Sequence, residues 1–307
     1  MLLGEPIILG GGGGIVCVVI ITTDPSAIVT CSLGNTSISK TANADGKAVF
    51  ELKKAGVWTI SASLDGETVS KEIDTNFALE AELYFVNPIL ENNSWETISK
   101  VAREGKATTF WNVGDTKSFV MDGVTYKAQI VGFDHYDVAD STAYGRTKAG
   151  ILFQFEKTPM KSYAMSDVQY PEGGYANVSL CSTISGFINS MESDLSNVIQ
   201  EVTIPYSAKP NDETASNMNA KLFLPSGYEI FGTRSSERIA IGTRYAFYAA
   251  GNSPIKTDVV TTVARQWWTR SLRMNSNNDY RVVTATGSGT TFVAPTNTNY
   301  IAPVFCI

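Results

Sequence analysis

The sequence is poor in the residues on which metal sites and nucleic-acid interfaces depend. Its 307 residues include one histidine, His135, and only 18% are charged, with a formal net charge of −6. A structural zinc site needs several histidine or cysteine ligands, and a broad nucleic-acid interface needs clustered lysine and arginine. No basic block is present. We therefore expect no metal, no other cofactor and no nucleic-acid partner.

Cysteine is also scarce. No two cysteines are spaced as a C-x-x-C motif, which would suggest metal binding or redox chemistry. The four residues are Cys17, Cys31, Cys181 and Cys306. We expect buried free thiols, which behave as small apolar side chains. A disulfide between Cys17 and Cys31, on two neighbouring strands, is the alternative.

Long hydrophobic runs are absent as well. Ile15–Ile21 is far shorter than the roughly 20 residues that span a bilayer, and Glu5 lies where a signal peptide would carry positive charge. We expect neither a signal peptide nor a transmembrane helix, and no membrane partner. The polarity comes largely from Ser, Thr, Asn and Gly, as is common in surface proteins. A virus particle released by cell lysis reconciles these features, so the predicted location is the virion, after synthesis in the bacterial cytoplasm.

Residues 1–14 form a distinct N-terminal segment. A short apolar stretch, MLLGEPIIL, precedes the five glycines Gly10–Gly14. Glycine gives a chain flexibility or allows very close backbone approach. Two interpretations stay open: a flexible linker, or a Gly-rich docking arm that inserts into other virion proteins.

Residues 15–85 show short alternating strands separated by turns. In one stretch Trp58, Ile60 and Ala62 share a face, and turns such as Asp65-Gly66 separate such runs. Short strands at this spacing predict a small β-sandwich. The stretches VTCSLG and DGKAVFELKKAGVWTISASLDG resemble the Ig-like or PEGA-like modules near the start of many phage tail proteins. The resemblance implies a spacer or docking module.

Residues 94–307 are predicted to form a second, α+β domain after a boundary at 86–92. Ser94 and Gly105 are suited to begin and end a short helix, and Asp122-Gly123 joins two alternating runs in a hairpin. Apolar residues at helical spacing predict one amphipathic helix over 180–199. Later apolar runs, including the terminal YIAPVFCI, are typical of strands.

No stretch of the sequence carries a specific catalytic motif. His135 has no G-x-S-x-G partner, and the aspartates around it lack the spacing of an EF-hand, so a structural turn is expected there. Acidic residues that meet only in three dimensions leave glycosidase chemistry open. Adjacent Trp267 and Trp268 point to opposite faces of a strand, so we expect them mainly in the core rather than in a flat sugar-binding platform.

Several stretches of residues 94–307 resemble a family of uncharacterised domains that recurs in prophage and gut-bacterial proteins. They are FWNVGDTK (110–117), QIVGFDHYD (129–137), AGILFQF (149–155), LFLPSGYEIFG (222–232), RQWWTRSL (265–272) and IAPVFCI (301–307). The resemblance implies the C-type-lectin-like fold that formylglycine-generating enzymes share, with a buried WW-R-S strand and a variable loop face. The sequence lacks that oxidase's cysteine pair and the E-P-N, Q-P-D or W-N-D triplets of calcium-dependent lectins.

The resulting interpretation is a bacteriophage virion surface protein without enzymatic activity, tail-associated, that binds a host-surface glycan or protein. The resemblance to phage proteins suggests a homo-oligomer, with a trimer as its form. The alternatives are a capsid-attached head fibre, decoration or baseplate protein without a specific receptor, and a polysaccharide-degrading enzyme. The candidate contacts lie in polar loops and are Asn275, Asn277, Asn278, Tyr280, Arg281, Asn297, Asn299 and Tyr300.

Overall fold

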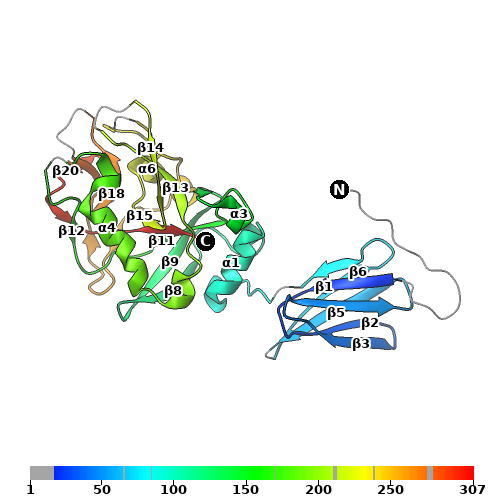
Figure 1. Cartoon of the computed structure of the whole chain (residues 1–307). Coiled ribbons are helices and arrows are strands. Elements are labelled where there is room, and N and C mark those ends of the chain that lie inside the picture. The colour runs from blue at the N-terminus through cyan, green and yellow to red at the C-terminus, as the bar shows by residue number, and fades with distance from the viewer. Residues whose placement is uncertain are drawn as a thin grey trace. The chain divides into compact units, whose positions relative to one another are not determined.

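The computed structural model shows a mainly β protein with several sheets and small helices (Figure 1). The structure describes residues 17–64, 66–83, 85–169, 171–209, 213–237, 239–274 and 279–307. The N-terminal arm assigned to residues 1–14 lies outside these ranges. The chain divides into two compact units, Met1–Val86 and Asn87–Ile307.

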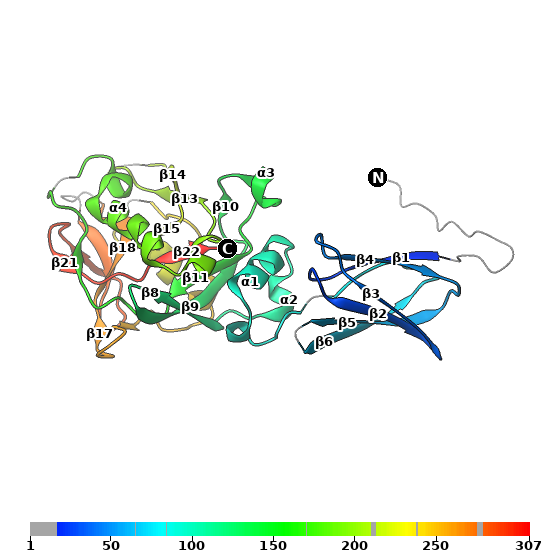
Figure 2. The ribbon, with the colours of Figure 1, turned by 60° about the horizontal axis from the view of Figure 1, so that its bottom comes forward.

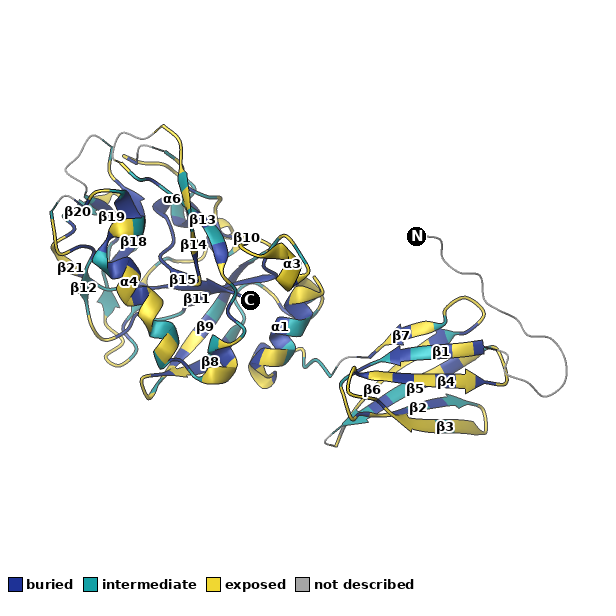
Figure 3. Ribbon diagram, in the orientation of Figure 1, coloured by how far each residue is buried: buried dark blue, intermediate teal, exposed yellow. Residues whose placement is uncertain are grey.

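The N-terminal unit is a sandwich of two β-sheets, with strand orders β4-β1-β7 and β3-β2-β5-β6. Side chains from both sheets form one core that contains Phe50, Trp58 and Ile60. Buried and exposed residues alternate along these strands, as the colours of Figure 3 show. Cys17 and Cys31 lie in this core as free thiols, as expected, and Cys181 and Cys306 are free and buried elsewhere. The strands are β1 Cys17–Thr22, β2 Ile28–Leu33, β3 Thr36–Thr41, β4 Lys47–Leu52, β5 Val57–Leu64, β6 Glu67–Asp74 and β7 Glu80–Glu82.

The outer face of the four-stranded sheet is lined by hydroxyl groups. Ser39, Thr30, Ser61 and Ser70 lie side by side across β3, β2, β5 and β6. The hydroxyls of Thr30 and Ser39 are 2.9 Å apart. Hydroxyl groups hydrate this face although they carry no charge. This accounts for part of the low charge content of the sequence.

Each edge strand of this sheet carries a lysine on the core side. Lys40 of β3 donates to the carbonyl of Val49 on β4 at 2.6 Å. Lys71 of β6 lies opposite the buried Ile60 in the β5–β6 register. An inward-pointing charge at a sheet edge opposes pairing with another edge strand.

We expect Lys71→Val to increase self-association, because the substitution removes the charge that guards the β6 edge. The control is Glu72→Val, which adds the same side chain on the outer face of the same strand. Sedimentation velocity over a concentration series measures the effect. Equal self-association of the two variants would show that the position of Lys71 has no protective role.

The C-terminal unit contains a five-stranded sheet of order β15-β22-β11-β9-β8, surrounded by smaller sheets and short helices. Its central strand β11 is buried at every residue. The strands are β8 Thr116–Met121, β9 Val124–Phe133, β10 Asp137–Val138, β11 Ile151–Phe155, β12 Tyr163–Ala164, β13 Val202–Tyr206, β14 Ser216–Ala220, β15 Leu222–Phe223, β16 Lys256–Thr257, β17 Ala264–Arg265, β18 Trp267–Leu272, β19 Tyr280–Val283, β20 Thr291–Val293, β21 Thr298–Asn299 and β22 Val304–Cys306.

The helices of this unit are short. The sequence correctly predicts helix α1, Trp95–Arg103. Its N-cap is Ser94, whose side chain accepts a hydrogen bond from the Thr97 amide. No helix in the described ranges is long and apolar enough to cross a bilayer. The helices of this unit are η1 Leu90–Asn92, α1 Trp95–Arg103, α2 Ala107–Phe110, α3 Ser141–Tyr144, η2 Gly174–Asn177, α4 Ser179–Gly186, η3 Phe187–Ser190, α5 Ser193–Ser196, α6 Gly227–Phe231 and α7 Ala246–Ala249.

The prediction of one continuous helix over 180–199 is wrong. The segment divides into α4, η3 and α5. The extended residues between η3 and α5 cover the edge of β8, where the Ser190 carbonyl accepts from Asp122 and the Glu192 amide donates to Val120. Backbone bonds to a sheet edge replace the helical bonds there, so apolar spacing alone misleads.

The two predictions for strands in this unit are confirmed. Asp122 and Gly123 join β8 and β9 in an antiparallel hairpin. Trp267 and Trp268 are both fully buried in β18, and their indole N–H groups donate to the carbonyls of Pro254 and Tyr163. Neither ring is exposed as a sugar-binding platform.

Candidate functional site

A buried ion pair joins β18 to the start of α6. Both guanidinium Nη atoms of Arg270 contact Glu229, with Nη2 at 2.6 Å from Oε1 and Nη1 at 2.7 Å from Oε2. Both side chains are fully buried. Tyr136 and Tyr245 also donate to this carboxylate, at 2.6 and 2.9 Å. The carboxylate is held by charge and by hydrogen bonds together.

Local sequence fixes the position of Glu229. Ser226 and Glu229 form a capping box at the start of α6, in which each side chain bonds the other residue's backbone amide. Gly242 passes close by with φ +78°, and a Cβ there would lie 2.0 Å from Glu229 Oε1. Only glycine fits this approach without displacing the carboxylate.

Burial and charge shift the pKa values of the groups in this cluster. Burial raises the pKa of a carboxyl group, but Arg270 and the hydrogen bonds outweigh burial and lower the pKa of Glu229 below its usual value. Burial and the nearby Glu229 raise the pKa of Tyr136 and Tyr245 well above normal. Burial lowers the pKa of His135, which packs edge-on against both tyrosine rings. The cluster joins β18 and α6 to the segments that contain Tyr136 and Tyr245.

A second ion pair fixes β19. Arg281 Nη1 lies 2.8 Å from Glu237 Oε1, and both side chains are almost fully buried. The same guanidinium donates to the carbonyls of Thr233 and Gly289 and lies 4.6 Å from the ring centroid of Phe231. Arg281 therefore joins three separate segments of the chain.

The structure corrects part of the candidate contact set. Tyr280 and Arg281 were expected on an exposed loop, but they belong to β19 and are buried, because the strand packs its side chains into the unit. Asn299 was also expected to be exposed, but it is 6% exposed and its Oδ1 accepts from Gln266 at 2.7 Å. These three side chains are therefore packed inside the unit and not on an exposed loop.

The remaining candidates are placed differently. Asn297 is exposed on the loop that follows β20. Tyr300 is half-buried, and the Arg265 guanidinium lies 4.8 Å from its ring centroid. Three candidates fall outside the described residues: Asn275, Asn277 and Asn278. Exposed ligand contact thus remains a prediction for Asn297 and Tyr300.

A polar hollow of about 470 Å³ lies beside the Asn297 loop. The Ser166 amide donates to Pro295 at 3.0 Å, and Thr296 donates to the Gln169 side chain at 3.2 Å, so two distant chain segments meet here. The residues that line the hollow are Ser166, Asp167, Val168, Ala176, Asn177, Val178, Ser179 and Ser182. We call this feature the serine hollow.

The backbone around the serine hollow is closely constrained. Gly174 has φ +65°, and a Cβ there would lie 2.1 Å from the Ser207 carbonyl oxygen. The Leu180 amide donates to Met165, which joins α4 to the strand segment before the hollow. The polar side chains are therefore presented by a fixed framework.

The side chains of the serine hollow suit a neutral ligand with many hydroxyl groups. Asp167 supplies a carboxylate that accepts hydrogen bonds, Asn177 supplies an amide that both donates and accepts, and Ser179 and Ser182 supply hydroxyls. An anion would meet the Asp167 charge. A polyol meets complementary donors and acceptors.

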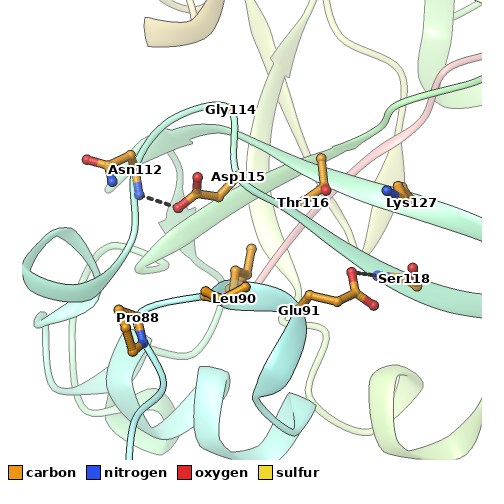
Figure 4. A pocket seen from close by; sticks show the side chains of 10 residues that line it. Pro88, Leu90, Glu91, Asn112, Gly114, Asp115, Thr116, Ser118 and Lys127 are labelled. Atoms are coloured by element: carbon orange, nitrogen blue, oxygen red, sulfur yellow. Dashed lines mark hydrogen bonds between the residues drawn. The ribbon is translucent and has the colours of Figure 1, made fainter.

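A second hollow, of about 510 Å³, lies between η1 and the β8–β9 hairpin (Figure 4). Glu91 and Asp115 both line it, but each accepts from a backbone amide, of Ser118 at 2.9 Å and of Asn112 at 2.8 Å. These carboxylates close the turn before β8 and hold η1 against its edge. We call this feature the hairpin hollow.

No group of three or more His, Cys, Asp or Glu side chains that could hold a metal ion is found in the described ranges. His135 contacts Thr243, with 3.4 Å between the ring Nε2 and the hydroxyl. The aspartates that follow in the sequence have other roles: Asp140 caps α3, and Asp137 pairs with Lys148.

Comparison with known families gives one match. Residues 153–307, half of the chain, match a domain of unknown function, DUF6273. The chain belongs to the DUF6273 family. Neither the curated proteins nor the solved structures give a match.

The DUF6273 segment contains some of these features and not others. Both ion pairs and the serine hollow lie inside it, and the hairpin hollow lies before it. Asp167, Asn177, Ser179 and Ser182 were missed as candidates, because only the fold brings them beside the 294–297 loop. A serine-rich stretch next to a helix start, SLCSTIS, was the one available signal.

Proposed function

We propose that this protein binds a polyhydroxylated ligand, such as a glycan of the bacterial surface, in the serine hollow. The observation that carries the proposal is the meeting of Asp167, Asn177 and two serine hydroxyls in one hollow, next to the segment of Pro295 and Thr296. A constrained backbone reduces the conformational entropy that is lost when these side chains bind a ligand.

The proposed setting is the surface of a bacteriophage virion, with tail association. Its support is the composition, the resemblance of the sandwich to Ig-like phage modules, and the resemblance of residues 94–307 to the C-type-lectin-like fold. The buried Trp267-Trp268 strand is compatible with the WW-R-S core strand of that fold. Attachment to other virion proteins through residues 1–14, and assembly as a homo-oligomer, would add avidity to weak glycan contacts.

The paired substitution Asp167→Ala and Asn177→Ala should weaken glycan binding about 10- to 100-fold, because it removes hydrogen-bond partners worth about 1–3 kcal/mol together. The measurement is retention of the labelled full chain on a panel of bacterial strains and on their isolated surface polysaccharides. The matched control is Asn112→Ala with Lys127→Ala in the hairpin hollow. Loss of retention in the control alone would move the binding site to that hollow.

Immunogold labelling of phage particles with antibody against residues 94–307 tests the setting. Label at the tail tip supports tail association. Label over the capsid would favour a head fibre or decoration protein, and particles without label would contradict the virion assignment.

A further inference from the structure

The sandwich has an open edge, where strands from its two sheets face each other. Lys40 of β3 ties the sheets together at Val49 of β4. Beyond this tie lies a hollow of about 250 Å³ with a mainly apolar lining. Half-buried Ile38 supplies apolar surface, Trp58 is only 1% exposed there, and the other lining residues are Thr36, Glu51, Lys53 and Lys54. We call this feature the edge hollow.

The register of β1 places Cys17, the first described residue, close to the edge hollow. Cys17 lies opposite Leu52 in the antiparallel β1–β4 pair, and Lys53 follows Leu52 directly. Figure 2 shows β1 and β4 adjacent in the sandwich. Cys17 therefore lies at the end of the sandwich where the hollow opens. Residues 10–16 can span up to about 23 Å, enough for residues 1–9 to reach it.

The chemistry of the N-terminal segment matches the edge hollow. MLLGEPIIL carries apolar side chains on both sides of Glu5, its one charged side chain. The hollow offers apolar surface with two lysines and one glutamate on its rim, a net positive charge. Ile7 and Ile8 complement Ile38 and the aliphatic stems of the two lysines, and Glu5 complements the charge of Lys53 or Lys54.

We infer that residues 5–8 dock into the edge hollow of the same chain, with Glu5 against Lys53 or Lys54 and the two isoleucines against the apolar lining. Burying two isoleucine side chains is strongly favourable, and the short tether keeps the local concentration of the segment high. A virion protein that binds residues 1–14 must therefore compete with the edge hollow for this segment. The inference concerns the N-terminal unit alone and does not depend on the serine hollow.

Zero-length carbodiimide cross-linking of the unaltered full chain tests the inference, because the reagent joins a carboxylate only to an amine in contact with it. We expect mass spectrometry of the monomer band to identify an amide between Glu5 and Lys53 or Lys54. Lys148 and Asp137, 2.9 Å apart and exposed, provide an internal positive control. Glu5→Gln should abolish the Glu5 cross-link and leave the control pair unchanged.

A second variant separates apolar docking from simple charge attraction. Ile7→Ser with Ile8→Ser keeps Glu5 and should lower the cross-link yield about tenfold or more. An undiminished yield would overturn the docking. Detection of the Asp137–Lys148 cross-link without any Glu5 cross-link would also overturn the docking. A Glu5 cross-link found only in the dimer band would assign the hollow to the N-terminal segment of a second copy.

Discussion

Arg270→Met should lower the free energy of unfolding of the C-terminal unit by about 3–5 kcal/mol, because it leaves a buried charge without its partner. Glu229 is fully buried and receives two contacts from this guanidinium. The same side chain donates to the carbonyls of Pro205 and Leu224, so two further segments lose their common anchor. Methionine replaces the aliphatic stem but none of these bonds.

Arg273→Met provides a matched control for this substitution. Arg273 lies just beyond the same strand, its side chain is 48% exposed, and it pairs with Asp279 at 3.7 Å. Exposed pairs contribute little, so its loss should cost less than about 1 kcal/mol. Urea unfolding of the full-length variants gives both values. Equal costs for the two substitutions would contradict the anchoring role of Arg270.

The contribution of Glu237 to the stability of the C-terminal unit should fall as the pH rises from about 5 to 8. Burial raises the pKa of this carboxyl group from 4.5 to about 7, although Arg281 opposes the rise. Between these values the folded protein keeps a proton that the unfolded chain releases. The stabilisation is therefore complete below pH 4.5 and is lost as the pH rises through 7, with a size of about 3 kcal/mol.

Glu237→Gln isolates this contribution, because glutamine has the shape of the protonated side chain and does not titrate. The free energy of unfolding, measured at pH 5, 6, 7 and 8, should depend less on pH in the variant than in the parent protein. His135 has a lowered pKa and acts in the opposite direction, but it is present in both proteins and cancels in the difference. Parallel pH profiles would show that Glu237 is ionised throughout.

Local signals in the sequence were sufficient for the sandwich, the β8–β9 hairpin and helix α1. In each, the pattern that predicts the element also stabilises it: alternation around Trp58, the turn at Asp122-Gly123, and the cap at Ser94. The helix predicted over 180–199 failed for the opposite reason. There the backbone bonds go to the edge of β8, a partner that lies far away in the sequence.

The candidate site was harder to predict, because polarity alone does not place a residue on the surface. Arg281 and Asn299 are polar residues near loops, yet each is buried against a partner supplied by another segment, Glu237 and Gln266. Asp167 and Asn177 belong to no recognisable sequence motif. They come together in the serine hollow only because the 166–182 and 294–297 segments pack against each other. Such pairings depend on the tertiary fold.

Hydrogen exchange of the full chain, with and without bacterial surface polysaccharide that it retains, tests the central claim most directly. The serine hollow predicts slower amide exchange in residues 166–182 and 294–300 when the polysaccharide is bound. Protection confined to residues 88–118, around the hairpin hollow, would contradict it. Unchanged exchange throughout the C-terminal unit, with polysaccharide still bound, would also contradict it.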